Sequence, residues 1–307
     1  MVKKMLKSYK KTRINRPIFL IIIEEFIISW LWYRTKVNKL FHNNLLNVSS
    51  DMKEDKLIDT YAFTHVEWVK EILAERGVML SGKKVLEIGP GGLLFRGLAF
   101  QGLGANYSAL DAFQGGCLSK EAKKLYLKFI NKVAKERMKF DNFNPKLMKI
   151  NELNYYQNTP IELASDKLNN QKFDIIFSHG VFEHLYDVAE GMNSCKNLLA
   201  DGGLMIHNVD FHAHDFWRSF PNPHMHLTLS NFQYRIAYPK FRGYPNRLRH
   251  SDFIKAINAS GLNLIELRDS EHYDEEVLKI RTRLPDDFSH YSDEDLLIQR
   301  ITYIANK

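Results

Sequence analysis

A tight glycine turn beside an acidic residue is the part of this sequence best suited to binding a small molecule. Residues 89–92 read Gly-Pro-Gly-Gly and directly follow a short apolar segment. Glycines at such a turn let a ligand approach the backbone closely. Glu87 stands two residues before Gly89, and its carboxylate suits a ligand that carries an ammonium group. The sequence therefore predicts a site for a cationic ligand at Glu87, Gly89 and Gly91.

A dinucleotide is the competing ligand for this turn. A pyrophosphate-binding turn has the pattern G-x-G-x-x-G after a strand, whereas Leu94 occupies the third glycine position here. This difference disfavours a nicotinamide-dependent dehydrogenase. S-adenosylmethionine fits the charge pattern better, because it carries an amino acid end and a sulfonium and has no pyrophosphate.

A second carboxylate stands where a sugar could be held. Asp111 directly follows the apolar segment 107–110, and it lies 22 residues after Gly89. A carboxylate can accept two hydroxyl hydrogen bonds at once. Asp111 is therefore a candidate for binding a ribose.

Short apolar segments alternate with helical periodicity through the main part of the chain. The apolar segments are residues 85–88, 107–110, 173–178 and 204–209, and helices are expected over 59–77, from Leu93 onward and over 120–140. This alternation predicts an α/β fold with a mostly parallel sheet and helices on both faces. Ligands of such sheets bind beyond the carboxyl ends of the strands, where the strand order reverses.

Two segments resemble motifs of the class I S-adenosylmethionine-dependent methyltransferases. They are residues 85–92, VLEIGPGG, and residues 173–187, FDIIFSHGVFEHLYD. The resemblance implies a Rossmann-like fold with a mostly parallel seven-stranded sheet, and S-adenosylmethionine as cofactor. It places the methionine part over the glycine turn and both ribose hydroxyls on Asp111. It also implies that residues 178–180, which include Ser178, line the methyl-transfer site, and that Ile161 packs on the adenine. Leu93 departs from the family, which often has a third glycine there.

Three further segments resemble a subgroup found in bacterial surface-polysaccharide gene clusters. They are residues 204–214, 246–249 and 291–296. The resemblance implies O-methylation of a sugar, nucleotide sugar or lipid-linked glycan by in-line methyl transfer. Two alternatives stay open: a methyltransferase acting on another small molecule, and a non-catalytic, membrane-associated protein that binds the cofactor.

A hydroxyl acceptor benefits from a base that removes its proton. We expect His214 or His179 to serve as this base, with Asp210 orienting it. We expect the acceptor to be bound by four residues, of which the two arginines suit an anionic group: His184, His212, Arg247 and Arg249. No metal ion is expected, because carboxylates and thiolates at metal-ligand spacing are missing from the sequence. Residues 211–250 contain four prolines, and we interpret them as a lid or acceptor-binding insertion in a methyltransferase domain spanning 51–307.

The positive charge of the chain is concentrated at its N-terminus. The chain has 43 basic and 36 acidic residues. Residues 1–16 contain seven of the basic residues and no acidic one, so the remainder holds 36 of each. A nucleic-acid enzyme usually has basic stripes across its folded face, and we therefore expect no nucleic-acid partner. With only two cysteines, a reducing and hence cytoplasmic location is expected.

Residues 1–50 are expected to form a separate basic and hydrophobic helical segment. Its apolar part, residues 18–33, is interrupted by Glu24 and Glu25. Three interpretations remain. The segment lies in the membrane interface at the inner surface, held by the basic run against anionic lipid; it packs on protein; or it spans the bilayer. The first of these predicts peripheral membrane contact through residues 1–33.

Overall fold

The computed structural model describes residues 16–34, 54–113, 116–135, 142–169, 171–214, 220–237 and 245–307. Nearly all of the basic run, residues 1–15, lies outside the described residues. The same holds for residues 35–53 and for two parts of the expected lid, residues 215–219 and 238–244.

Seven strands of the described residues form one sheet, in the order β3-β2-β1-β4-β5-β7-β6. β1 to β5 run parallel, whereas β7 is antiparallel to both of its neighbours. This arrangement confirms the mostly parallel seven-stranded sheet. The strands are β1 (Lys84–Ile88), β2 (Asn106–Leu110), β3 (Asn154–Tyr156), β4 (Phe173–His179), β5 (Leu199–Asp210), β6 (Asn263–His272) and β7 (Ile298–Asn306).

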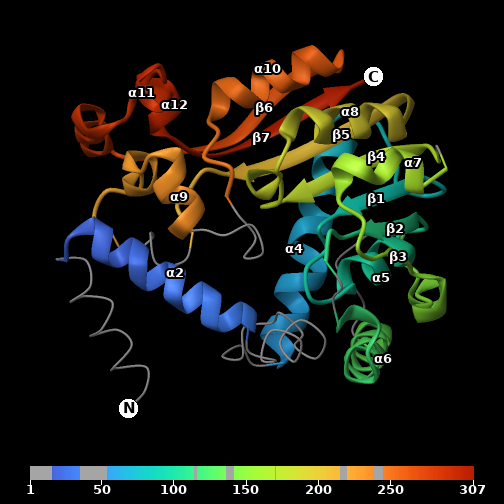
Figure 1. Ribbon diagram of the computed structural model, residues 1–307. Helices are drawn as coiled ribbons and strands as arrows, with labels where there is room; N and C mark the ends of the chain where they lie inside the picture. The colour runs from blue at the N-terminus through green and yellow to red at the C-terminus, as the bar shows by residue number, and fades with distance from the viewer. Residues whose placement is uncertain are drawn as a thin grey trace.

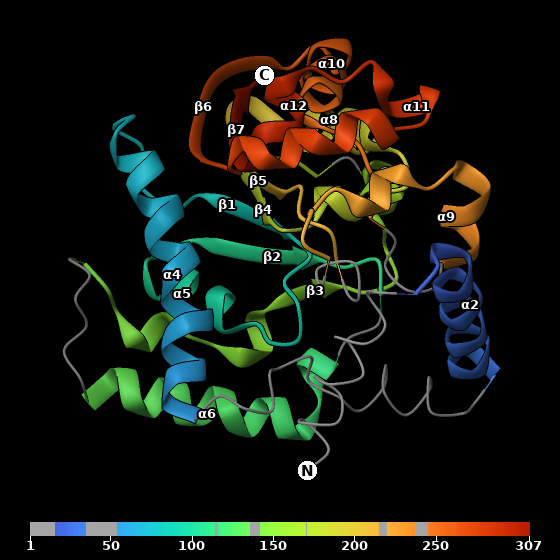
Figure 2. The same ribbon diagram turned by 90° about the vertical axis from the view of Figure 1, so that its left-hand side faces the viewer.

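Helices cover both faces of the sheet, as Figure 2 shows. One face carries α4 (Glu54–Ala74), α5 (Phe95–Gly102) and α6 (Lys120–Lys135), and the other carries α7 (Ala164–Lys167), α8 (Val188–Leu198) and α10 (His250–Ser260). Successive side chains of a strand point to opposite faces. Val85 accordingly packs in the first core and Leu86 in the second. The expected helix over 120–140 is described only as far as Lys135.

Short elements connect these layers. They are η1 (Gly116–Leu118), η2 (Pro145–Leu147), η3 (Ile150–Glu152), η4 (Ile161–Leu163), η5 (Phe182–His184), η7 (Met225–Thr228), η9 (Glu275–Arg283), α11 (Asp286–Ser289) and α12 (Asp293–Leu297). The turn η5 directly follows β4 and is succeeded by α8, whose first turn is capped by the Asp187 carboxylate accepting from the Glu190 N–H at 3.0 Å. This cap sets where α8 begins.

The apolar helix α2 (Ile18–Arg34) lies away from the sheet, beside α9 (Asn231–Ala237) of the expected lid (Figure 1). Ile21 and Ile22 are buried, in a cluster that includes Tyr234 and Ala237. Several other apolar side chains of α2 are exposed: Phe19, Leu20, Ile23, Phe26 and Ile27. Among the described residues, no helix is both long and apolar enough to cross a bilayer. Packing on protein therefore accounts for one part of the α2 surface.

Candidate active site

The glycine turn lies where the strand order reverses, between β1 and β4. Both key glycines have left-handed backbone angles, with φ of 67° at Gly89 and 75° at Gly91, a region that glycine adopts without strain. A Cβ at Gly89 would lie 2.6 Å from Val181 Cγ2, whereas a Cβ at Gly91 would meet nothing within 4 Å. The turn thus packs tightly on the segment after β4 and opens at Gly91.

The Glu87 carboxylate lies beneath this turn and is bonded within the protein. Its two oxygens contact the Arg96 guanidinium and the Tyr107 hydroxyl, and only 2% of the residue is exposed. Arg96 also donates to the Pro90 carbonyl oxygen at 2.6 Å and lies 3.1 Å from His65 Nδ1. Nothing in the sequence marked Arg96 or His65, and direct contact between Glu87 and a cofactor stays a prediction.

Asp111 directly follows β2, on the neighbouring side of the turn. Its Oδ1 accepts a hydrogen bond from the Phe113 N–H at 2.9 Å, and its carbonyl accepts one from the Thr159 N–H at 2.8 Å. Burial raises the pKa of Asp111 to about 6, although the side chain is only partly covered. A carboxylate in this position can receive hydroxyl donors.

Two residues that the resemblance assigned to the cofactor site are buried. Ile161 is 2% exposed and lies against α8, within 3.7 Å of the position of a Cβ on Gly191. Ser178 is fully buried, and its hydroxyl lies 2.8 Å from His207 Nδ1. Their side chains thus support the fold at the edge of the site, and contact with the cofactor stays a prediction.

His179 is the last residue of β4; it is exposed, and two aromatic rings of α4 lie beside it. Its ring centroid lies 4.1 Å from that of His65 and 6.0 Å from that of Trp68. Partial burial lowers the pKa of His179 to about 4, and the charges of Arg300 and Arg96 add to this effect. The imidazole is therefore neutral at pH 7 and able to accept a proton. No sequence motif indicated that His65 and Trp68 of α4 lie beside His179.

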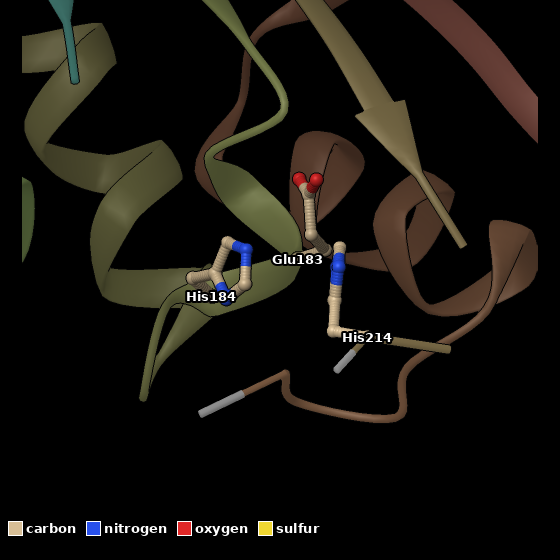
Figure 3. Close-up of side chains that lie close together, drawn as sticks. All are labelled: Glu183, His184 and His214. Carbon is tan, nitrogen blue, oxygen red and sulfur yellow. The ribbon is translucent and has the colours of Figure 1, made fainter. Parts of the chain in front are cut away.

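Glu183, His184 and His214 form a cluster beyond the ends of β4 and β5 (Figure 3). The structure thus brings His184, expected to bind acceptor, to His214, expected to be a base, with ring centroids 4.6 Å apart. Glu183 was assigned no role from the sequence. It is 4% exposed, and burial raises the pKa of its carboxyl to about 8.

Asp210 lies at the end of β5 and contacts His212 and Arg300. Its Oδ1 accepts from the His212 N–H at 2.9 Å and lies 3.8 Å from His212 Nδ1, while its Oδ2 accepts from Arg300 at 3.2 Å. Asp210 is thus close to His212, and the expectation that it orients His179 or His214 stays untested.

Arg247 and Arg249, which were expected to bind an anionic part of the acceptor, are buried. Arg247 donates to the Leu229 carbonyl at 2.7 Å and covers the Tyr234 ring at 4.0 Å. Arg249 donates to the Phe211 carbonyl at 2.8 Å. Both nevertheless line a narrow pocket, together with Glu183, Asp210, His212 and His226. Binding of an acceptor by the arginines stays a prediction.

A family model and a curated relative each match part of this chain. Residues 86–205 match the model of a family described as "Methyltransferase domain". A tRNA U34 carboxymethyltransferase of Helicobacter hepaticus (strain ATCC 51449 / 3B1) is 26% identical over 167 residues, which are 52% of this chain and 50% of that protein. The chain thus spans about half the length of the curated relative it matches.

Two solved structures of methyltransferases are similar to this chain at low identity. An S-adenosylmethionine-dependent methyltransferase from Mesorhizobium loti is 13% identical with a TM-score of 0.42, covering 77% of this chain and 96% of its own. An arsenic(III) S-adenosylmethionine methyltransferase from Chlamydomonas reinhardtii is 14% identical with a TM-score of 0.40, covering 74% and 63%.

The open glycine turn lies at the reversal of strand order, and the Asp111 carboxylate directly follows the adjacent strand β2. These features occur within the segment that matches the family model. The part of the chain that matches the methyltransferase model thus contains both the glycine turn and the carboxylate that an S-adenosylmethionine site needs.

Proposed function

We propose that the protein transfers a methyl group from S-adenosylmethionine to a hydroxyl of a sugar, a nucleotide sugar or a lipid-linked glycan. One observation carries the transfer activity: the glycine turn that opens at Gly91 lies next to the partly covered carboxylate of Asp111. The acceptor class is supported by the resemblance of residues 204–214, 246–249 and 291–296 to the polysaccharide-cluster subgroup.

The residues at the turn fit this cofactor. A side chain at position 91 would fill the space in front of the turn, and glycine leaves it open. Asp111 would accept both ribose hydroxyls, since a carboxylate has two acceptor oxygens. Arg96 links Glu87 to Pro90 and keeps the turn in its bent form. The glycine turn would therefore hold the methionine part of the cofactor, and Asp111 would hold its ribose.

The sulfonium supplies an activated methyl group, whose bond to sulfur breaks as its bond to the acceptor oxygen forms. The chain must chiefly align the acceptor and receive the hydroxyl proton. His179 is our first candidate for the proton acceptor, because it ends β4 two residues before Val181, which contacts the glycine turn. His214 is the alternative.

A tRNA acceptor is the second candidate, and it is favoured by the name of the Helicobacter hepaticus relative. Against it stands the charge distribution, because residues 17–307 contain equal numbers of basic and acidic residues. Proteins that bind nucleic acid usually concentrate positive charge on the binding face. We therefore favour the sugar acceptor.

A transfer assay with labelled methyl donor tests the proposal. The full chain is incubated with the donor and, separately, with nucleotide sugars, lipid-linked glycans extracted from membranes, and total tRNA, and the products are identified by mass spectrometry. Label on a sugar hydroxyl supports the proposal, whereas label on tRNA supports the second candidate. Cofactor binding without label on any acceptor would favour the non-catalytic alternative.

We also propose that α2 contacts an anionic bilayer surface. Its exposed apolar side chains include Phe19, Ile23 and Phe26, and the preceding residues are rich in lysine and arginine, a combination typical of interfacial helices. Co-sedimentation with phosphatidylserine vesicles tests this. The double change Phe19→Glu and Ile23→Glu should abolish sedimentation, whereas Leu127→Glu, on an exposed site of α6, should not. Equal sedimentation of both variants would contradict the proposal.

A further inference from the structure

We propose that Glu183, His184 and His214 form a binding site for a divalent transition-metal ion, of which Zn²⁺ is the best fit. The sequence alone predicts no metal ion. His184 and His214 are 30 residues apart in the chain, and only the fold brings them together. The role of this metal ion in catalysis rests on the proposed methyl transfer, whereas metal binding itself does not.

The geometry of the three side chains supports this site. Their ligand atoms all lie within 4.8 Å of one another. Tetrahedral zinc with bonds of roughly 2.0–2.1 Å needs ligand atoms about 3.3 Å apart, so modest side-chain rotations would complete the site. Figure 3 shows two of the residues on the turn after β4 and the third on the segment after β5. The backbone on both sides is thus held by strands of the same sheet.

A buried oxygen points to a missing ligand. Glu183 Oε2 is buried and has no hydrogen-bond partner among the described residues, and the residue is 4% exposed. An unpartnered buried carboxyl oxygen is costly, since the group has given up its hydration. A cation bound between Glu183 and the two imidazoles would supply the interaction.

The donor set indicates the kind of metal ion. Two imidazoles and one carboxylate occur in catalytic zinc sites, which leave one position open for water or substrate. Imidazole suits zinc, iron, nickel and copper, whereas magnesium and calcium prefer oxygen ligands. The site should therefore bind Zn²⁺ well and Mg²⁺ poorly.

The cluster is linked to the glycine turn through two neighbouring residues. Glu183 Oε1 lies 3.4 Å from the position of a Cβ on Gly180, and Val181 Cγ2 lies 2.6 Å from that of a Cβ on Gly89. A metal ion here would thus be held by the segment that packs on the glycine turn. Bound beside the acceptor hydroxyl, it would lower the pKa of that hydroxyl and so assist proton transfer to a weak base such as His179.

Metal analysis of the full chain tests the site directly. The protein is stripped with a chelator and titrated with Zn²⁺ in competition with a chromophoric chelator, without cofactor or acceptor. Bound zinc is counted by elemental analysis, and Co²⁺ is substituted to record the visible absorption of a tetrahedral site. The variants are Glu183→Gln, His184→Ala and His214→Ala. His290→Ala removes an exposed histidine elsewhere and is the matched control.

We expect one zinc ion per chain and at least about 100-fold weaker binding in each cluster variant, because one of three protein bonds is lost. The control should bind as the wild type does. Circular dichroism and S-adenosylhomocysteine affinity establish that each variant is folded. Weak zinc binding by the wild type, or equal loss in the control, overturns the metal site. Retained S-adenosylhomocysteine affinity in that case leaves the proposed function standing, whereas loss of that affinity in the wild type would refute the proposed function independently.

Discussion

Arg96 donates a hydrogen bond to the carbonyl oxygen of Pro90, at 2.6 Å, from the same nitrogen that pairs with the Glu87 carboxylate. The ion pair is almost completely buried, with 8% and 3% of the two side chains exposed. The shape of the glycine turn therefore depends on a residue of α5 as well as on its own glycines.

Removal of the Arg96 charge should damage both stability and cofactor binding. Arg96→Met leaves the buried Glu87 carboxylate without its cation, which typically costs about 3–5 kcal/mol. We expect the free energy of unfolding to fall by that amount in urea denaturation. The double variant with Glu87→Gln should recover part of the stability and not the affinity for S-adenosylhomocysteine. Full affinity in the double variant would show that Arg96 does not shape the turn.

Cofactor affinity should depend on pH through Asp111. Its pKa of about 6 belongs to the empty site, and ribose hydroxyls donate to the ionised form. The dissociation constant should therefore be constant above pH 7 and rise about tenfold per pH unit below 6, as protonation competes with binding. Asp111→Asn should bind more weakly at pH 8 and lose this rise. Calorimetry from pH 5 to 8 measures the dissociation constants of the wild type and of Asp111→Asn. Identical pH profiles of the two proteins would contradict the role of Asp111.

Gly91 offers a test in which backbone strain is separated from ligand contact. Gly91 and Gly202 have φ of 75° and 72°, and an added Cβ would meet nothing within 4 Å at either residue. Alanine in this region costs roughly 1–2 kcal/mol, so both variants should lose similar stability. Only Gly91→Ala should lose affinity for S-adenosylhomocysteine. Equal affinity of the two variants would place the cofactor elsewhere.

His179 should affect turnover and leave cofactor binding unchanged. If it receives the acceptor proton, His179→Ala should lower kcat by about 10²–10⁴-fold. The affinity for S-adenosylhomocysteine should stay that of the wild type, as should all parameters of His290→Ala. Wild-type turnover of His179→Ala would assign the base to another residue, and His214 would be the next to test.

Ser178 should contribute to stability rather than to binding. Its buried hydroxyl pairs with His207 Nδ1 at 2.8 Å, and removal of one partner of a buried pair costs about 1–3 kcal/mol. Ser178→Ala should show this loss in thermal or urea unfolding, with unchanged cofactor affinity. A folded variant with weakened cofactor binding would instead support the direct contact between Ser178 and the cofactor that the family resemblance implies.

The parallel half of the fold could be predicted because its strands are short, apolar and buried. Residues 85–88, 107–110, 173–178 and 204–209 all lie in β1, β2, β4 and β5. The other three strands gave no separate signal. β3 has only three residues, and β6 is an edge strand that is exposed along most of its length. A strand at the position of the antiparallel β7 was expected only because the family resemblance implies seven strands.

The glycine turn and Asp111 could be predicted because a local pattern encodes them. Arg96 and His65 could not, since they reach the turn from α5 and α4 through packing that no spacing reveals. The burial of Arg247 could not be predicted either. Its guanidinium covers the rings of Tyr234 and Phe288, which are far apart in the chain. The cluster of Glu183 with His214 depends on two strand ends meeting at one edge of the sheet.

Isothermal titration of S-adenosylhomocysteine into the full chain, compared with Asp111→Ala at pH 8, tests the central claim most directly. We expect one binding event per wild-type chain. We also expect at least about tenfold weaker binding by the variant, because hydrogen bonds to a charged group are worth about 1.5–3 kcal/mol each. Absence of binding to the wild type, or equal affinity of the two proteins, would contradict that claim.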